Sequence, residues 1–176
     1  TDDGMSLFVK GTVSSKIIVE KIIVSTEDSA IKAIILEINS AGVSAVASDE
    51  IAQAVKAAQE KNKTVVAWIR EVGASGGYWI ASSADIIVAN RMAITGSIGV
   101  IASYLDYSGL ITKYNVSYQR LVAGKYKDIG SPFKPLSSEE EEFMQKRLDM
   151  LHDIFIDEVA HNRQLPVKQV RELANG

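Results

Sequence analysis

Cysteine is absent from this chain of 176 residues, and histidine occurs only twice, at His152 and His161. The lack of cysteine excludes thiol catalysis, disulfide bonds and cysteine-ligated metal sites. The two histidines do not have the i, i+4 spacing of a helical zinc site, so we interpret both as surface or core residues. These residue types therefore give no support to a metal centre.

Long hydrophobic runs and a strong net charge are also missing. No apolar run reaches the ~18 to 20 residues that cross a bilayer, and a net charge of −3 gives no general attraction to nucleic acid or anionic lipid. The length and the 47% of hydrophobic residues suit a single soluble domain over residues 1–176. Because the chain opens without Met and stops at "VRELANG", we interpret it as part of a longer protein.

Four short, β-rich apolar runs predict strands that are covered on both faces. They are "AIKAIILEI" (30–38), "KTVVAWI" (63–69), "ADIIVAN" (84–90) and "VSYQRLVA" (116–123). Residues 48–62 between the first two have a helical apolar face, with Ser48 or Asp49 as the expected N-cap. We expect residues 15–30 to be helical too, although their β-branched residues favour a strand. The alternation indicates an α/β fold built from βαβ units.

The clearest predicted helix covers residues 135–166. Ser137 and Ser138 are each followed three residues later by Glu, which gives two candidate capping boxes. The four acids of residues 139–142 suit the positive first turn of a helix, and we prefer this interpretation to a metal or partner site. One apolar face then consists of Met144, Leu148, Leu151, Phe155 and Val159. Pro166 is expected to open a last short helix.

The stretch "GASGG" places Ser75 at an expected strand-to-helix turn, before Gly76 and Gly77. Such a serine is either a helix cap or an exposed nucleophile, with the Gly76 amide free to bind an anion. A nucleophilic serine needs a base. Neither histidine lies on a loop, whereas the loop "AGKYKDIGSPFKP" carries Lys125, Lys127 and Lys134. A lysine base must be neutral, which requires a dry site, and three solvated lysines are the alternative.

A family resemblance separates these alternatives. The motifs "NSAGVSAVASDEI", "GASGGYWIASSADIIVAN", "TGSIGVI" and "GKYKDIGSPFKPLSSEE" follow one another over roughly residues 30–175. Together they resemble the signal peptide peptidase A family of bacteria and archaea. The resemblance implies a ClpP/crotonase-like α/β fold with a long C-terminal helical arm. It also implies a membrane-associated serine endopeptidase that uses a Ser-Lys dyad, without cofactor or metal, on signal-peptide remnants and other peptides.

The motifs also imply a role for individual residues. Ser75 matches the nucleophile and Lys127 the general base, whereas Lys125 matches a non-catalytic position. The backbone amide of Gly76, with that of Gly42 or Val43, matches the oxyanion hole. The family's "NSPGG" loop is "NSAGV" in this chain, so alanine replaces the proline and Val43 replaces the second glycine.

The same resemblance implies partners and a location. Identical subunits are expected to form a ring in which neighbouring protomers share each dyad. A single-pass anchor outside this chain would hold the protein in the cell membrane of a bacterium or archaeon, with an extracytoplasmic catalytic domain. Two other functions stay open: an acyl-CoA-processing enzyme of the crotonase type, and a non-catalytic scaffold.

Overall fold

A computed structural model describes residues 13–176 of the chain. These residues form two compact units, one made of residues 13–99 with 155–176 and the other of residues 100–154. The prediction of a single domain over residues 1–176 stays a prediction.

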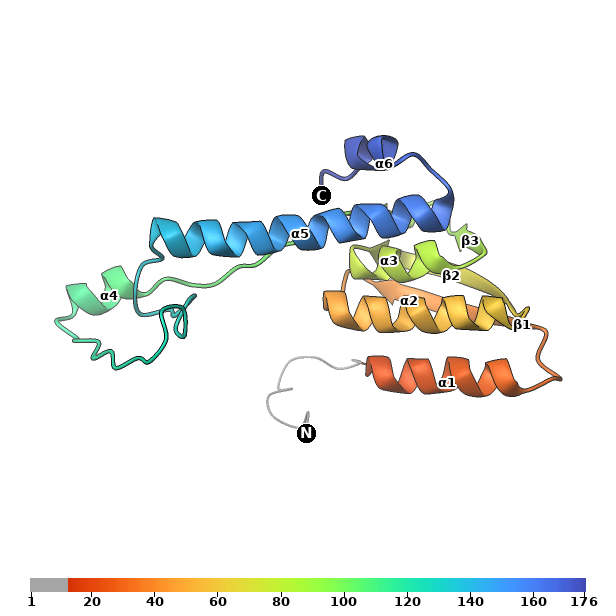
Figure 1. The fold of residues 1–176 in the computed structure, drawn as a ribbon, viewed down its shortest axis with the longest axis horizontal. Coiled ribbons are helices and arrows are strands. Elements are labelled where there is room, and N and C mark those ends of the chain that lie inside the picture. The colour runs from red at the N-terminus through yellow and green to blue at the C-terminus, as the bar shows by residue number, and fades with distance from the viewer. Residues whose placement is uncertain (1–12) are drawn as a thin grey trace. The chain divides into compact units, whose positions relative to one another are not determined.

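A parallel sheet organises the first unit (Figure 1). Its strands are β1 (Ala33–Ser40), β2 (Thr64–Ala74), β3 (Ile86–Ala89) and β4 (Ile94–Gly96). Strands β1, β2 and β3 lie in this order, and β4 pairs with the last three residues of β2. All three pairings are parallel, as expected of βαβ units. The carboxyl ends of β1 and β2 therefore lie at the same edge of the sheet.

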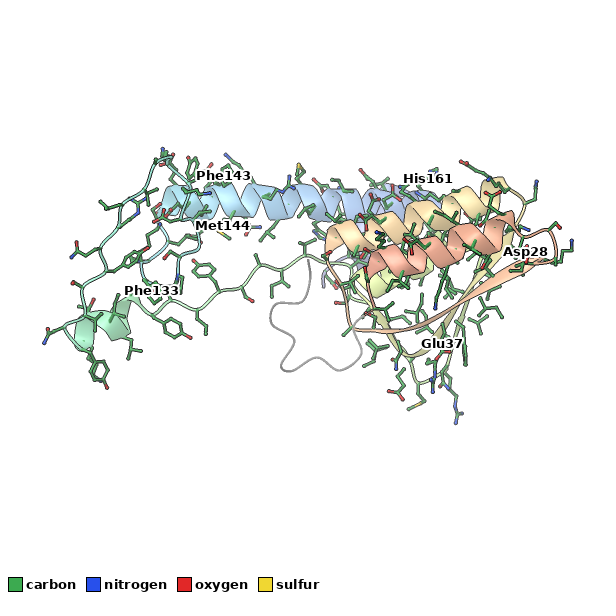
Figure 2. All side chains as sticks on the ribbon, turned by 90° about the horizontal axis from the view of Figure 1, so that it is seen from below. Asp28, Glu37, Phe133, Phe143, Met144 and His161 are labelled. Carbon is green, nitrogen blue, oxygen red and sulfur yellow. The ribbon has the colours of Figure 1, made fainter. Side chains whose placement is uncertain are left out.

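Three helices cover one face of this sheet: α1 (Ser15–Glu27), α2 (Ala45–Glu60) and α3 (Gly76–Ser83). Alternate strand residues such as Ile34, Val65 and Ile69 enter the core between the sheet and the helices. On the other face, Ile35 is 67% exposed and Trp68 is 42% exposed. Figure 2 shows Glu37 on the side of the sheet away from α1 and α2. The prediction of two covered faces is therefore wrong for the described residues, because no helix packs on this second face.

The predicted helix over residues 15–30 is confirmed, because tertiary packing of α1 outweighs the β propensity of its isoleucines and valines. The expected N-cap of α2 is wrong. Ser44 caps the helix, since its hydroxyl accepts a hydrogen bond of 3.2 Å from the amide of Ala47. Ser48 lies one turn further on, is fully buried, and donates to the Ser44 carbonyl at 3.1 Å.

The long helix α5 (Ser138–Arg163) confirms the clearest helix of the sequence, and α6 (Val167–Leu173) follows Pro166 as expected. In the first unit, the last part of α5 packs on α3. The rings of Trp79 and Phe155 are stacked there, with centroids 4.8 Å apart. Ile156, Val159 and Val170 complete this second small core. Helix α3, which begins after Ser75, is thus packed against both core clusters.

The second unit contains α4 (Ser108–Lys113), an irregular segment and the first part of α5. The predicted strand over residues 116–123 is wrong, because these residues pair with no strand among the described residues. A β-strand needs a neighbour for its backbone groups, and sequence pattern alone does not supply one. At the start of α5 one of the two capping boxes is confirmed, with Ser137 and Glu140 bonded in both directions.

Candidate active site

Ser75 occupies a strained turn between β2 and α3. Its backbone has φ 51° and ψ −125°, a combination that non-glycine residues rarely adopt and that costs on the order of 1–3 kcal/mol. The Ser75 amide donates to the carbonyl of Gly96 at 2.8 Å, and its carbonyl accepts from Trp79 at 2.9 Å. Both sides of the turn are therefore anchored, to β4 and to the first turn of α3.

The Ser75 side chain does not cap the helix that follows it. Within residues 13–176, its half-buried hydroxyl has no hydrogen-bond partner. The strain is therefore not offset by a capping bond, and the turn presents a free hydroxyl at the carboxyl edge of the sheet. This is the geometry that places a serine nucleophile at the end of a strand. Of the two roles left open by the sequence, the geometry favours the nucleophile.

The loop after β1 packs directly against this turn. A Cβ atom added to Gly42 would lie 3.2 Å from Cβ and 3.5 Å from Oγ of Ser75. A Cβ atom added to Gly76 would lie 3.0 Å from the backbone nitrogen of Val43, and one added to Gly77 would lie 2.9 Å from the carbonyl oxygen of Ser40. Glycine is required here because two backbones approach more closely than a side chain allows.

The backbone amides of this loop differ in what they bind. The Gly42 amide donates to the hydroxyl of Ser40 at 3.2 Å. The amides of Val43 and Gly76 have no acceptor among the described residues. Val43 is also not among the non-glycine residues with positive φ, so its β-branched side chain brings no strain to the loop. Val43 and Gly76 contact each other next to Ser75, so their two unpaired N–H groups belong to backbone that packs beside the nucleophile candidate. Such unpaired N–H groups are suited to binding an oxyanion.

The second unit carries the three candidate lysines, and two of them are engaged. Lys125 pairs with Glu139, which also accepts a hydrogen bond of 2.8 Å from Tyr126. Lys134 pairs with Glu140. The exposed amine of Lys127, by contrast, has neither an ion pair nor a hydrogen bond with any residue from 13 to 176. Lys127 is therefore the lysine of this loop that is free to serve another group.

Ion pairs on either side of Lys127 shift the pKa values of the charged residues around it. Arg120 binds both carboxylate oxygens of Asp128 and lowers the pKa of that carboxyl. The bond to Glu139 raises the pKa of Lys125 above its usual value, which is the wrong direction for a general base. Bonds from Lys134 and from the Ser137 amide lower the pKa of Glu140 to about 2. Three acids of the run 139–142 thus form ion pairs, and one of them, Glu140, also caps the helix.

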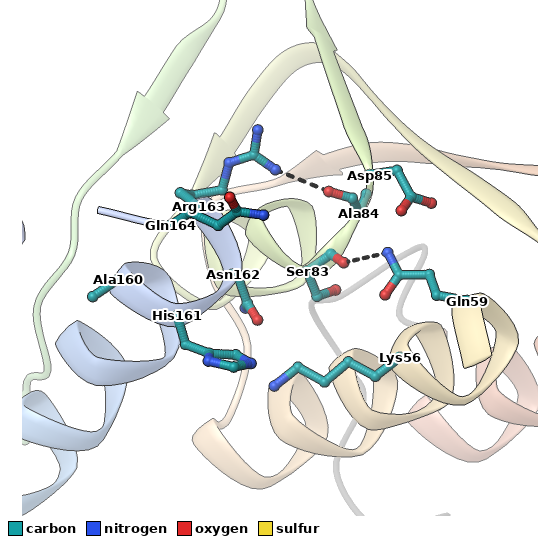
Figure 3. A pocket seen from close by; sticks show the side chains of 10 residues that line it. All are labelled: Lys56, Gln59, Ser83, Ala84, Asp85, Ala160, His161, Asn162, Arg163 and Gln164. Carbon is teal, nitrogen blue, oxygen red and sulfur yellow. Dashed lines mark hydrogen bonds between the residues drawn. The ribbon is translucent and has the colours of Figure 1, made fainter. Parts of the chain in front are cut away.

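A hollow of about 780 Å³ lies at the opposite, amino edge of the sheet (Figure 3). Most of its polar groups bind within the protein. Arg163 donates to the Ala84 carbonyl at 2.9 Å, and Gln59 donates to the Ser83 carbonyl at 2.9 Å. Both bonds satisfy carbonyls at the end of α3. His161 lines this hollow, as does Lys56, whose amine pairs with Glu158. We interpret these contacts as helix capping rather than as a binding site.

Two contacts of the site were not predicted from the sequence. The carbonyl of Gly96 anchors Ser75, and the hydroxyl of Ser40 binds the Gly42 amide in the loop after β1. The motif "TGSIGVI" contains Gly96 and was noted only through the family resemblance. Nothing in the sequence pattern indicated a role for the Ser40 hydroxyl. Among the described residues there is no group of three or more His, Asp or Glu that could hold a metal ion.

The comparison with known families matches residues 57–176 to peptidase family S49. A candidate protease of Methanocaldococcus jannaschii is 38% identical over 150 residues, which cover 85% of this chain and 48% of that protein. The chloroplastic serine protease SPPA of Arabidopsis thaliana is 36% identical over 160 residues, 90% of this chain and 24% of that protein. The chain thus spans half or less of the length of these curated relatives.

Among solved structures, a mutant of ClpP1 from Listeria monocytogenes superposes with a TM-score of 0.50 at 14% identity, over 90% of this chain and 70% of that one. At 14% identity the similarity is evidence for the fold alone, and it confirms the ClpP/crotonase-like α/β fold. Within residues 13–176, no helix combines the length and apolar character that a bilayer crossing requires. The resemblance seen in the motifs is confirmed: this chain belongs to peptidase family S49.

Proposed function

We propose that this chain carries the catalytic centre of a serine endopeptidase with a Ser-Lys dyad. Ser75 is the nucleophile, Lys127 is the general base, and the amides of Gly76 and Val43 hold the oxyanion. The observation that carries the proposal is the strained turn of Ser75, which presents a free hydroxyl beside two unpaired amides. Strain at a site is expected where it serves a function.

The reaction follows from these groups. Lys127 Nζ takes the proton of Ser75 Oγ as the oxygen bonds to a peptide carbonyl carbon, and the carbonyl oxygen becomes an oxyanion held by the two amides. Collapse of this intermediate breaks the C–N bond, and the proton on Nζ passes to the leaving amine. Lys127 Nζ then deprotonates a water molecule as its oxygen bonds to the acyl carbon. Collapse of this second intermediate breaks the C–Oγ bond, releases the acid and returns the proton from Nζ to Ser75 Oγ.

The proposal includes a neighbouring protomer. A lysine base must be kept from water, and Lys127 is exposed in the single chain. The segment before it is exposed and apolar as well, with Leu121 99% exposed. A second copy of the chain that covers this segment would desolvate Lys127. A ring of identical subunits that share each dyad meets this requirement.

The substrates proposed are extended peptides with small or apolar residues before the cut, including remnants of signal peptides. The proposed location is the cell membrane of a bacterium or archaeon, by an anchor outside this chain, with the catalytic domain extracytoplasmic. Substrates and location both rest on the motif resemblance and on membership of family S49.

An active-site probe tests the proposal. A fluorophosphonate should label Ser75, and the Ser75→Ala variant should lose both labelling and hydrolysis of a fluorogenic peptide library. The Ser29→Ala variant is the matched control, because the Ser29 side chain is exposed and makes no hydrogen bond with residues 13–176. Thioester turnover without peptide hydrolysis would instead favour an acyl-CoA enzyme. Failure of the wild-type protein to label would favour a non-catalytic scaffold.

A further inference from the structure

Ser40, the last residue of β1, binds the loop that faces the nucleophile. Its hydroxyl accepts a hydrogen bond from the Gly42 amide at 3.2 Å and donates one to the Gly42 carbonyl at 3.4 Å. A single side chain therefore contacts both peptide groups that flank Gly42. Neither bond is needed to continue the strand or to start α2, whose cap is Ser44.

Because the peptide bond is planar, the contacts of Ser40 also determine the direction of the Val43 N–H. The carbonyl of Gly42 and the N–H of Val43 belong to one trans peptide unit, so they point in opposite directions. When Ser40 holds the carbonyl, the Val43 N–H is turned away from Ser40. The Gly42 N–H, in contrast, points at the Ser40 hydroxyl and is occupied.

The position of the loop is fixed by contacts with the start of α3. The Ser40 carbonyl oxygen lies 2.9 Å from the place of a Cβ atom at Gly77, and the Val43 nitrogen lies 3.0 Å from that at Gly76. These two contacts place the loop but involve neither the N–H nor the C=O group of Gly42. Gly42 has φ +144°, in a region where glycine meets little steric resistance. A further contact is therefore needed to hold the peptide groups on either side of Gly42 in one orientation.

We propose that Ser40 is a positioning residue of the oxyanion site. It fixes the peptide between Gly42 and Val43 so that the Val43 amide, and not the Gly42 amide, joins Gly76 as an oxyanion donor. The inference rests on the proposed function, and it gives a physical reason why the Val43 amide takes part and the Gly42 amide does not. The role matters in this chain because alanine stands at position 41, where a proline would restrict the loop.

Kinetics of three variants test this role. Loss of one oxyanion donor costs on the order of 100- to 1,000-fold in kcat. A donor that is present but no longer held should cost less, so we expect Ser40→Ala to lower kcat about tenfold with KM unchanged. Ser40→Thr keeps a hydroxyl and suits a strand end, and should keep most of the activity. Ser44→Ala, the matched control, loses a cap and melts earlier but keeps its kcat.

Two kinetic outcomes would overturn the inference: a Ser40→Ala variant with the wild-type kcat, or a Ser40→Thr variant as slow as Ser40→Ala. A second measurement needs no turnover. Amide-proton temperature coefficients from NMR should show a hydrogen-bonded Gly42 amide and an unbonded Val43 amide in the wild-type protein, and an unbonded Gly42 amide in Ser40→Ala. An unbonded Gly42 amide in the wild type overturns the role of Ser40. Inactivity of a wild type with the expected coefficients overturns only the proposed function.

Discussion

The hydroxyl oxygen of Ser75 lies 3.5 Å from the point where a Cβ atom on Gly42 would stand. The loop after β1 and the turn after β2 are thus in backbone contact at the carboxyl edge of the sheet. This contact leaves no room for an unstrained Cβ atom at Gly42 or at Gly76. It also brings the free hydroxyl and the two unpaired amides into one small volume.

Replacing Gly42 with alanine should damage both the site and the fold. The new Cβ would lie 3.2 Å from Cβ of Ser75, at a φ of +144°. We expect the free energy of unfolding to fall by about 1–3 kcal/mol and kcat/KM to fall at least about tenfold as the amides shift. Gly109→Ala is the control, since nothing lies within 4 Å of its added Cβ in helix α4. Denaturant melts and peptide hydrolysis compare the two variants. Equal stability and equal kcat/KM of the Gly42 and Gly109 variants would contradict the account.

At Gly76 the expected damage can be divided into two parts. An added Cβ would meet the buried Ser48 hydroxyl first, then Cγ2 of Val43 at 2.9 Å and the backbone nitrogen of Val43 at 3.0 Å. Gly76→Ala should therefore lose stability and activity. A second change, Ser48→Ala, removes the hydroxyl but not the contact with the backbone, so the double variant should regain part of its Tm without regaining kcat. Full recovery of activity in the double variant would show that the Val43 amide is not part of the site.

Two neighbouring lysines provide a matched pair. Lys127→Ala should abolish peptide hydrolysis, because the variant has no base for Ser75. Lys125→Ala should remove the exposed ion pair with Glu139 and the contact of the amine with the Tyr126 ring, and should keep kcat near the wild-type value. Steady-state kinetics on both variants show which lysine is needed for hydrolysis, and thermal melts check that both variants fold. Equal loss of activity in the two would leave Lys127 with no special role.

The cap of helix α5 should respond to acid in a defined range. The pKa of Glu140 is lowered from 4.5 to about 2 by Lys134 and by the Ser137 amide. Its ionised carboxylate therefore adds stability that is fully present above about pH 4.5 and is lost as the pH falls through about 2. Glu140→Gln should lower Tm at pH 7, and the difference from the wild type should shrink below pH 4.5.

Glu141→Gln is the control for this measurement, because the exposed Glu141 side chain has no partner within the described part of the chain. A Tm difference for Glu140→Gln that stays constant from pH 7 to pH 2 would contradict the ionic cap. An NMR titration of the Glu140 carboxyl gives the same answer directly, with an expected midpoint near 2.

The local turn at Ser75 could be predicted from sequence, because two glycines between an apolar strand and an apolar helix serve few other purposes. The helix over residues 15–27 was harder to predict, since its β-branched residues favour a strand until packing on α2 is considered. The cap of α2 at Ser44 was missed because helix boundaries depend on which serine faces the backbone. Residues 116–123 have the composition of a strand, but the chain supplies no pairing partner among the described residues.

The state of the three lysines could not be predicted at all. Lys125 pairs with Glu139, 14 positions away, and Lys134 pairs with Glu140. Such pairs depend on how the loop folds back on the start of α5, which no local pattern encodes. The same holds for Ser40, whose two bonds to Gly42 exist only because the chain turns sharply after β1.

The most direct test of the dyad mixes two inactive variants. Ser75→Ala and Lys127→Ala are each expected to hydrolyse no peptide, and they are then refolded together in equal amounts. If neighbouring protomers share each dyad, random assortment should restore about a quarter of the sites, and the mixture should show about a quarter of the wild-type rate. Substantial activity in either single variant contradicts the Ser75–Lys127 dyad itself, and a mixture that stays inactive contradicts its sharing between protomers.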